Sequence, residues 1–292
     1  MTKRTAAGYA KKARNLGLEM PTTSPQLQLA TITSREYRPP GFWCVSIRCP
    51  DIARAAGPAQ YAALDLPGGF AVRLPLGIFT VKGDDFTVLF QEWGERTTRL
   101  AHAAIGDSVS CIGPLGNRFS VPQRGRHAIL AGGGLGVAAL WLLARDLREQ
   151  GVKATIVIGA RSADRVVGVR DLAKHGFDVE VCTDDGSAGF AGTVVERVRA
   201  LRRPDVIYAC GPRGMLRALC NHAEREGIDC QISMEETFGC SMGTCWGCVV
   251  PVRRGSAQGT SYPRAPGEAR DYDLARVCAD GTVFHAKDVV WV

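Results

Sequence analysis

The chain has 292 residues, 46% of them hydrophobic, and this length and composition are enough for two or three compact domains. Its net charge is +7 at neutral pH. No apolar run approaches the length of a membrane span and no signal peptide is visible, so we expect a cytoplasmic protein. Seven of the eleven cysteines stand among apolar or helical neighbours, as is typical of reduced, mostly buried thiols. They are Cys44, Cys49, Cys111, Cys182, Cys210, Cys220 and Cys230.

The first 26 residues carry a large part of the positive charge. Five Lys or Arg residues against Glu19 alone give +4, in a segment without clear apolar periodicity. Residues 1–26 are therefore predicted to form a basic, flexible tail. No aromatic stacking platform or reading motif accompanies it, which argues against a nucleic-acid partner, and a cleaved transit sequence is the other alternative.

Residues 27–122 contain short apolar runs with turn sequences between them. The runs cover residues 27–33, 42–47, 69–73, 86–90 and 108–112, and the turns are rich in proline, glycine and aspartate. One helix is expected at residues 97–104. Several short strands joined by turns predict a small, all-β antiparallel barrel.

Residues 123–231 change to an α/β pattern of strand, glycine turn and helix. A strand at 127–130 leads into a glycine turn, a helix at 137–149 and a further strand at 154–158. A second turn follows the strand at 205–209 and begins another helix. Two such turns after parallel strands predict a nucleotide site, with a bare α/β core as the alternative. The candidate binding residues are Gly132, Gly133, Gly134, Gly136, Gly211, Pro212 and Met215.

Four cysteines in the last predicted domain, residues 232–292, follow the spacing C-x4-C-x2-C and then one distant C. This is the spacing of thiolate ligands to a plant-type [2Fe-2S] cluster, because three ligands on one tight loop can wrap a small cluster while the fourth comes from another segment. Glycines within the loop let backbone N–H groups approach sulfur. A zinc site is the alternative, although zinc prefers paired short spacings. The candidate ligands are Cys240, Cys245, Cys248 and Cys278.

Together these pieces resemble the electron-transfer subunits of class 1B dihydroorotate dehydrogenase, a branch of the ferredoxin reductase superfamily. The resemblance runs from about residue 27 to the C-terminus. Its most specific parts are Met234-Glu235-Glu236 leading into Cys240, the segment 276–284, and Gly113-Pro114-Leu115-Gly116-Asn117. It implies a ferredoxin-reductase-like fold: an FAD-binding β-barrel, a parallel-sheet NAD-binding domain and a small C-terminal [2Fe-2S] domain.

The resemblance also implies a function in pyrimidine biosynthesis. NADH would deliver a hydride to FAD, and the cluster would exchange single electrons with an FMN-containing dihydroorotate dehydrogenase catalytic subunit in a hetero-oligomer. The resemblance places Cys210 near the nicotinamide. The alternative is that Cys210 is simply a small buried residue that ends a strand. Two alternative functions remain. One is a related electron-transfer protein of the superfamily with another acceptor, and the other is a flavin-free iron–sulfur regulatory or binding module.

The expected flavin site departs from the family pattern. The relatives have Arg-Arg-Pro-x-Ser on a barrel strand, whereas this chain has Arg73-Leu74-Pro75-Leu76-Gly77. Leu74 and Gly77 therefore leave one phosphate contact and one hydrogen bond to the flavin ring in question. The family's Gly-Thr pair corresponds to Arg96-Thr97, and Arg96 could supply the missing cation; an exposed helix charge is the alternative.

Two further departures lie outside the flavin site. The relatives often have proline after the glycine run, whereas this chain continues Gly136-Val137-Ala138-Ala139, in which alanine is a good helix former. The resemblance favours NAD. Arg161 could contact the 2′-phosphate of NADP, but one arginine does not overturn the preference for NAD. Residues 252–275 contain several arginines, prolines and glycines, which predicts a long polar loop.

Overall fold

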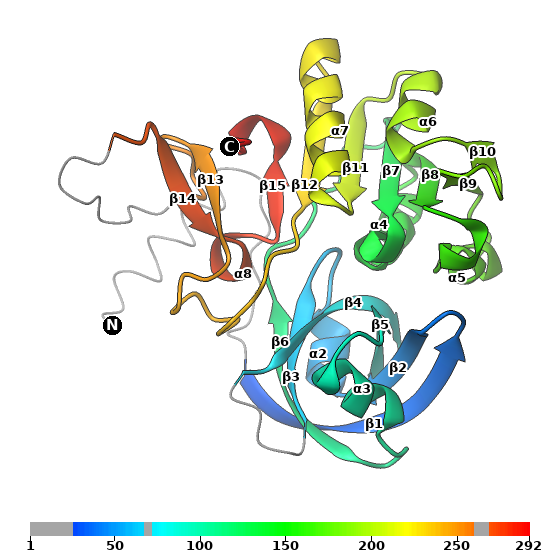
Figure 1. The fold of residues 1–292 in the computed structure, drawn as a ribbon, viewed down its shortest axis with the longest axis vertical. Helices are drawn as coiled ribbons and strands as arrows, with labels where there is room; N and C mark the ends of the chain where they lie inside the picture. The colour runs from blue at the N-terminus through cyan, green and yellow to red at the C-terminus, as the bar shows by residue number, and fades with distance from the viewer. Residues whose placement is uncertain (1–25, 67–71, 260–268) are drawn as a thin grey trace.

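The structure is a computed structural model that describes residues 26–66, 72–259 and 269–292. The predicted tail thus lies outside the described residues, apart from Gln26. Figure 1 shows a β-barrel next to an α/β unit, with a strand pair from the C-terminal region beside both. No helix in the described part of the chain is long and apolar enough to cross a membrane.

The N-terminal part is a closed barrel with the strand order β1-β2-β5-β4-β3-β6, and every neighbouring pair is antiparallel. This confirms the predicted antiparallel barrel. Two short helices, α2 (Pro50–Ala55) and α3 (Glu95–His102), lie between its strands. The strands are β1 (Gln26–Arg38), β2 (Phe42–Arg48), β3 (Tyr61–Asp65), β4 (Leu74–Lys82), β5 (Asp85–Gln91) and β6 (Ser108–Leu115).

Strands β3 and β4 were not predicted, because their local sequences argue against strands. β3 is rich in alanine, and β4 contains Pro75 and Gly77, which usually interrupt a strand. Pairing on both sides nevertheless holds β4, which pairs with β3 up to Gly77 and with β5 from Ile78. The predicted strand at 69–73 is wrong for Val72 and Arg73, which lie in no strand, and residues 67–71 lie outside the described residues.

The α/β unit is built on a seven-stranded sheet with the order β10-β9-β8-β7-β11-β12-β15. All neighbours are parallel except β15, which is antiparallel to β12. The chain starts at β7, moves outward through β8 and β9, and then returns to β11 and β12 on the other side. The strands are β7 (His127–Gly133), β8 (Lys153–Ala160), β9 (Val179–Thr183), β10 (Phe190–Ala191), β11 (Val206–Cys210), β12 (Asp229–Ser233) and β15 (Val283–His285).

The adjacent strands β7 and β11 therefore form a topological switch point, where ligands bind in folds of this kind. The helix after β7, α4, has the predicted bounds Val137–Glu149 and follows the short 3-10 helix η1 (Gly134–Gly136). The other elements of this unit are α5 (Val169–Lys174), α6 (Val194–Ala200), α7 (Arg213–Glu226) and the 3-10 helix η2 (Ala163–Arg165).

The C-terminal part contains the antiparallel pair β13 (Val249–Arg253) and β14 (Tyr272–Arg276), followed by α8 (Val277–Asp280) and the 3-10 helix η3 (Ala286–Asp288). The prediction of a polar loop over residues 252–275 is wrong at both ends. Val252 and Ala275 are fully buried in the two strands, because the apolar residues at the strand ends pack inward. Residues 260–268 of that stretch lie outside the described residues.

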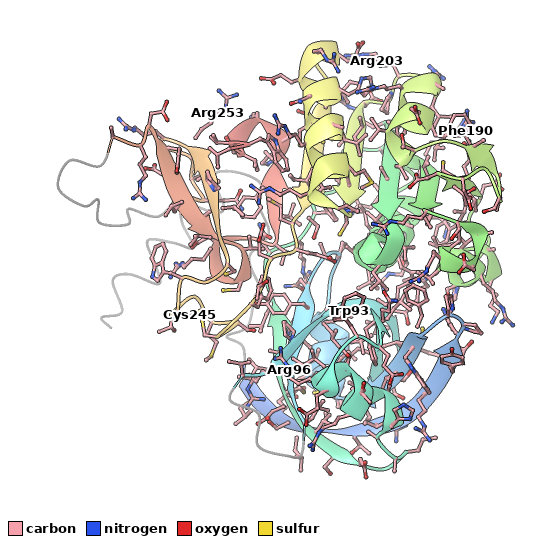
Figure 2. The ribbon with its side chains drawn as sticks, viewed as in Figure 1. Trp93, Arg96, Phe190, Arg203, Cys245 and Arg253 are labelled. Carbon is pink, nitrogen blue, oxygen red and sulfur yellow. The ribbon has the colours of Figure 1, made fainter. Side chains whose placement is uncertain are left out.

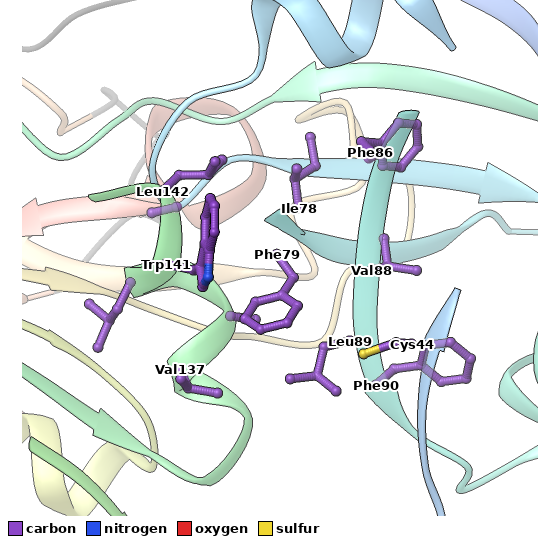
Figure 3. Packing of buried hydrophobic residues seen from close by; sticks show 14 of the residues in the cluster. Cys44, Ile78, Phe79, Phe86, Val88, Leu89, Phe90, Val137, Trp141 and Leu142 are labelled. Carbon is purple, nitrogen blue, oxygen red and sulfur yellow. The ribbon is translucent and has the colours of Figure 1, made fainter. Parts of the chain in front are cut away.

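Hydrophobic clusters join the three parts into one body. One cluster unites the barrel with α4, and Figure 3 shows Val137 and Trp141 of this helix beside Phe79 and Leu89 of the barrel. A second cluster combines the central sheet with barrel residues and with the C-terminal strands. Full burial of side chains of this size contributes about 1.5–3 kcal/mol each. All seven cysteines outside the C-terminal set are free and buried, as predicted.

Candidate functional site

A cleft of about 260 Å³ opens where the barrel, the α/β unit and the C-terminal part meet. Strand β4 contributes Pro75, Leu76 and Gly77, and the first turn of α4 contributes Ala138. Residues 233–238 form a third wall and end two residues before Cys240. Of the predicted site residues, Pro75, Leu76 and Gly77 line the cleft, and its other walls adjoin the first glycine turn and the segment that leads into Cys240.

A larger cleft of about 610 Å³ lies between α7 and the pair β13–β14, away from the glycine turns. It contains both acidic and basic side chains, and Arg253 and Glu224 within it are 3.5 Å apart. None of the sequence-predicted site residues lines it. The smaller cleft is therefore the candidate site.

Only the second half of the predicted flavin segment, Pro75 to Gly77, lines the cleft. Leu74, at which the family resemblance predicted an arginine, is 7% exposed and belongs to the barrel core. Arg73 donates to the carbonyl oxygen of Ser110 at 3.2 Å and to its Oγ at 2.9 Å, and lies 3.6 Å from the Asp65 carboxylate. A Cβ on Gly77 would have no heavy atom within 4 Å, so this position opens into free space.

Arg96 and Thr97 lie at the start of α3, next to the flavin segment. The Arg96 Nη1 donates to the carbonyl oxygens of Arg73 at 3.1 Å and Val72 at 3.4 Å, so this guanidinium holds the segment's backbone. Thr97 Oγ1 accepts hydrogen bonds from the backbone N–H groups of Trp93 and Gly94, which caps the helix. Figure 2 shows Arg96 on the side of the barrel that carries Trp93.

The two glycine turns pack directly against each other at the carboxyl ends of β7 and β11. A Cβ on Gly136 would lie 2.0 Å from the carbonyl oxygen of Cys210. A Cβ on Gly133 would lie 2.7 Å from Pro212 Cδ and 2.9 Å from Met215 Sδ. Glycine is thus required at Gly136 because the two backbones approach so closely, whereas at Gly133 a Cβ would meet side chains of the second turn. Gly132 and Gly211 are similarly enclosed, whereas Gly134 has a φ of +56° and open space around it.

Cys210 ends β11 directly behind the cleft. Its side chain is 1% exposed, and its Sγ lies 4.0 Å from Oε1 of Glu235, a cleft residue that the sequence did not single out as functional. Burial raises the pKa of the Cys210 thiol well above its ordinary value. Glu235 is open to the solvent in the cleft, but the surrounding walls raise the pKa of its carboxyl. The thiol is therefore neutral at physiological pH.

The loop after the cleft directs backbone N–H groups at its cysteine sulfurs. Cys240 Sγ accepts hydrogen bonds from Met242, Thr244 and Cys245 at 3.4, 3.2 and 3.3 Å. Cys245 Sγ accepts from Cys240 and Gly247, both at 3.4 Å. Burial alone would raise the pKa of Cys240, but these donors outweigh it and lower the pKa to about 6. Cys245, labelled in Figure 2, lies at the exposed edge of the loop.

A second thiol pair is assembled by the register of β13 and β14. Val249 pairs with Arg276, so Cys248 and Cys278 adjoin the paired ends, and the Val277 N–H donates to the Cys248 carbonyl at 2.9 Å. The Cys278 N–H donates to Cys248 Sγ at 3.4 Å. The Cys278 thiol also donates to that sulfur, which lowers the pKa of Cys248 to about 7 although burial opposes the change. The four predicted ligands thus stand as two pairs.

Arg276 fixes the two cysteine segments to each other. Its Nε and Nη2 donate to the Asp280 carboxylate at 2.9 and 3.0 Å, and its Nη1 donates to the Gly243 carbonyl oxygen at 2.8 Å. The guanidinium also lies 4.9 Å from the centre of the Trp246 ring. Asp280 is 8% exposed, so this bidentate pair is largely shielded from water. Neither residue was predicted as a site residue.

The backbone of the cysteine loop is unusual at glycine and non-glycine positions alike. Gly243 has a φ of +78°, and a Cβ there would lie 2.7 Å from Ala279 Cβ. Ser241 and Trp246 also have positive φ values of +57° and +58°, which non-glycine residues rarely adopt. Such strain is typical of functional loops that the surrounding contacts hold in place.

Tyr61 connects the cleft to both cysteine segments, and no sequence pattern predicted it. Its hydroxyl donates to the carbonyl oxygens of Ser241 at 3.0 Å and Cys278 at 3.1 Å. Its ring is 5.1 Å from that of Phe238, and both residues line the cleft. The side chain is 4% exposed, and burial raises the pKa of the phenol well above its usual value, which keeps it a donor.

Comparison with known proteins places this arrangement in a family. No family model matches the chain. It is 37% identical over 224 residues to a dihydroorotate dehydrogenase B (NAD(+)), electron transfer subunit, from Bacillus caldolyticus, covering 75% of this chain and 80% of that protein. The chain belongs to this family. A subunit of the same name from Desulforamulus reducens is 30% identical over 259 residues, covering 86% of this chain and 94% of the relative.

Solved structures support the fold of this dihydroorotate dehydrogenase B electron transfer subunit family member. A chain of an NADH-dependent reduced ferredoxin–NADP oxidoreductase has a TM-score of 0.74 at 25% identity, covering 93% of this chain and 92% of that one. The ferredoxin reductase of a carbazole 1,9a-dioxygenase has a TM-score of 0.62 at 19% identity, covering 72% and 68%. The predicted family, the ferredoxin-reductase-like fold and the assignment to an oxidoreductase subunit are thus confirmed.

Proposed function

We propose that this chain passes electrons between NAD(H), FAD and a [2Fe-2S] cluster, and exchanges them with an FMN-containing dihydroorotate dehydrogenase catalytic subunit. One observation carries the proposal. A single cleft is bounded by the first turn of α4, by the flavin segment of the barrel and by the residues that lead into Cys240. Three groups bound there would lie close enough together for electrons to pass between them.

The cysteine segments fit a [2Fe-2S] cluster, with Cys240, Cys245, Cys248 and Cys278 as the residues that would hold it. When bound, such a cluster carries one electron at a time. Two thiol pairs suit two irons that each take two thiolates, whereas zinc needs its four ligands around one ion. Among the residues that the structure describes, no three His, Cys, Asp or Glu side chains gather as ligands of a single ion. The N–H groups aimed at sulfur stabilise thiolates before any metal is bound.

The barrel side of the cleft fits a flavin. The open position at Gly77 leaves room for a ring, with Pro75 and Leu76 as apolar contacts and backbone groups available for hydrogen bonds. Arg73 and Arg96 flank the same segment, and we assign them to the phosphates of FAD, with Thr97 holding the helix start beside them. Leu74 supports this segment from the barrel core. When bound, FAD accepts an electron pair and releases single electrons.

The glycine turns fit a dinucleotide. Gly133, Gly134 and Gly136 precede the N-terminus of α4, where the helix dipole favours phosphate. The second turn, with Gly211, Pro212 and Met215, closes the switch point from the other side. Cys210 lies behind Glu235 and would shield the nicotinamide from water as a neutral thiol.

The test is a metal and flavin inventory of the anaerobically purified chain. We expect about two iron atoms and one flavin per chain, and a visible spectrum that NADH bleaches. Zinc in place of iron, or an iron–sulfur spectrum without flavin, would contradict the proposal. The second outcome is favoured by one observation, the burial of the apolar Leu74 in the barrel core, and would identify a flavin-free iron–sulfur binding module.

The partner requires a separate experiment. Affinity-tagged chain is co-expressed with a dihydroorotate dehydrogenase catalytic subunit from the same organism. We expect the two to purify together, and dihydroorotate-dependent NAD⁺ reduction to require both. A catalytic subunit that reduces NAD⁺ in the absence of this chain would refute the proposed partner. So would a tagged chain that purifies without the catalytic subunit. A related acceptor would then be sought.

A further inference from the structure

An uninterrupted chain of hydrogen bonds leads from the barrel to a cysteine sulfur. The Tyr61 hydroxyl donates to the carbonyl oxygen of Ser241 at 3.0 Å. That carbonyl belongs to the same peptide unit as the N–H of Met242, which donates to Cys240 Sγ at 3.4 Å. The phenol proton is therefore one peptide unit away from the predicted ligand sulfur.

Hydrogen bonds in such a chain strengthen one another. A donor on a carbonyl oxygen draws electron density toward that oxygen, which makes the N–H on the other end of the resonant peptide a better donor. The effect is larger in a dry environment, and here Tyr61 and Ser241 are both buried. Donors to a thiolate favour the reduced cluster, because the reduced cluster places more negative charge on sulfur.

The phenol reaches the second cysteine segment as well. The same hydroxyl lies 3.1 Å from the Cys278 carbonyl oxygen, so its proton is shared between the two segments in a three-centre bond. Both segments are thereby held to strand β3, whose Tyr61 is the register partner of Gly77 in the flavin segment. One side chain thus touches the proposed flavin cleft and fixes the proposed cluster loop.

The geometry points to Tyr61 as a positioning residue that raises the reduction potential of the cluster through the Ser241–Met242 peptide. This inference rests on the proposed function, since it requires a cluster on Cys240. Tyr61 needs no charge change for this role, because it acts as a neutral donor. The ring remains in place when only the oxygen is removed, so the hydrogen bond can be tested separately from packing.

The test compares Tyr61→Phe with a matched control, Tyr208→Phe. Tyr208 is also buried and donates to a backbone carbonyl, that of Ser120 at 2.6 Å, and its ring packs against Phe119 rather than against a cysteine segment. The readout is the cluster midpoint potential in an EPR-monitored redox titration, with iron content measured on the same sample. We expect Tyr61→Phe to lower the equilibrium constant for cluster reduction about threefold to tenfold, the upper end corresponding to 59 mV for one electron. We expect Tyr208→Phe to leave it unchanged.

The inference is overturned by a full-iron Tyr61→Phe variant with an unchanged potential, or by an equal shift in Tyr208→Phe. If Tyr61→Phe loses its iron, a second variant decides: 3,5-difluorotyrosine incorporated at position 61 alone. Fluorination makes the phenol a stronger donor, so the potential should rise, and an unchanged or lower potential would refute the relay. A wild-type chain without any cluster would instead refute the proposed function, which iron analysis shows directly.

Discussion

The cysteine segments and the flavin segment reach the same cleft, but they are fixed in different ways. In the cysteine segments, backbone N–H groups already point at sulfur, and Arg276 ties the two pieces together through Asp280 and Gly243. In the flavin segment, Leu74 turns into the core, Arg73 is engaged with Ser110, and Gly77 faces open space. The cysteine region is held by hydrogen bonds within the chain, whereas the flavin region has open space at Gly77.

The difference has a physical source. A backbone N–H donor is present at every residue except proline, so a loop of the right shape can surround sulfur whatever most of its side chains are. Contacts to a flavin ring and its phosphates depend on individual side chains, and the sequence predicts a departure from the family pattern at these positions. The cysteine region should therefore be sensitive to changes in its scaffold, and the flavin region should be open to improvement.

The largest expected effect tests the ligand set. Cys248→Ala should abolish cluster binding, because a two-iron cluster with three thiolates lacks one ligand. Iron analysis and EPR should fall to background, while bound flavin stays, since the flavin segment lies on the barrel. Cys44→Ala is the control, as Cys44 is an equally buried free thiol in β2. Full iron in Cys248→Ala would break the assignment of the pairs.

Asp280→Ala tests the scaffold that joins the cysteine segments. Removing this carboxylate leaves the partly buried Arg276 without its bidentate partner, which should lower the free energy of unfolding by about 3 kcal/mol. The control is Asp51→Ala, whose partner Arg54 is 63% exposed; exposed pairs contribute about 0–1 kcal/mol. Urea unfolding of the two variants measures the difference. Equal losses in the free energy of unfolding would mean that the Arg276–Asp280 pair stabilises the protein no more than an exposed ion pair does.

Gly136→Ala tests the contact between the two glycine turns. A methyl group 2.0 Å from the Cys210 carbonyl must push the turns apart, so we expect a loss of about 2 kcal/mol in stability. NADH binding should weaken about tenfold, or about 1.4 kcal/mol. Gly214→Ala is the control, because its Cβ meets nothing within 4 Å in the first turn of α7. Calorimetric titration measures the affinity of both variants for NADH. Equal affinities would contradict a nucleotide site at these turns.

Gly77→Ser should have the smallest effect and the opposite sign. The position has free space, and the added hydroxyl restores the family's serine beside the proposed flavin ring. One net hydrogen bond of about 1 kcal/mol should lower the dissociation constant for FAD about fivefold. Gly77→Ala adds the same Cβ without the hydroxyl and should bring no gain. Weaker FAD binding in Gly77→Ser would show that the ring does not lie at this position.

Sequence patterns predicted those parts of the molecule that are governed by local geometry. The helix at 137–149 has the predicted bounds, and the two glycine turns meet at the predicted switch point. The barrel was predicted as a type, but strands β3 and β4 were missed. Alanine in β3 and the proline and glycine in β4 conceal strands that exist only because neighbouring strands pair with them.

The residues that connect the sites could not be predicted for a related reason. Tyr61 reaches Ser241 and Cys278 over 180 and 217 positions of sequence, and Arg276 reaches Gly243 over 33. Tyr61 stands in no recognisable motif, and the family segment that begins at Arg276 gives no sign of the contact with Gly243. The positive φ values at Ser241 and Trp246 were equally unpredictable, because non-glycine residues adopt them only when surrounding contacts impose them.

The sequence by itself determined the cysteine spacing, the glycine turns and the family, because each depends on residues that are close along the chain or recur as motifs. Tertiary structure alone decided how these pieces meet. The register of β13 and β14 brings Cys278 to Cys248, and the closure of the barrel brings Tyr61 to both cysteine segments. Such contacts arise from burial and pairing across the whole fold, where local sequence preferences carry little information.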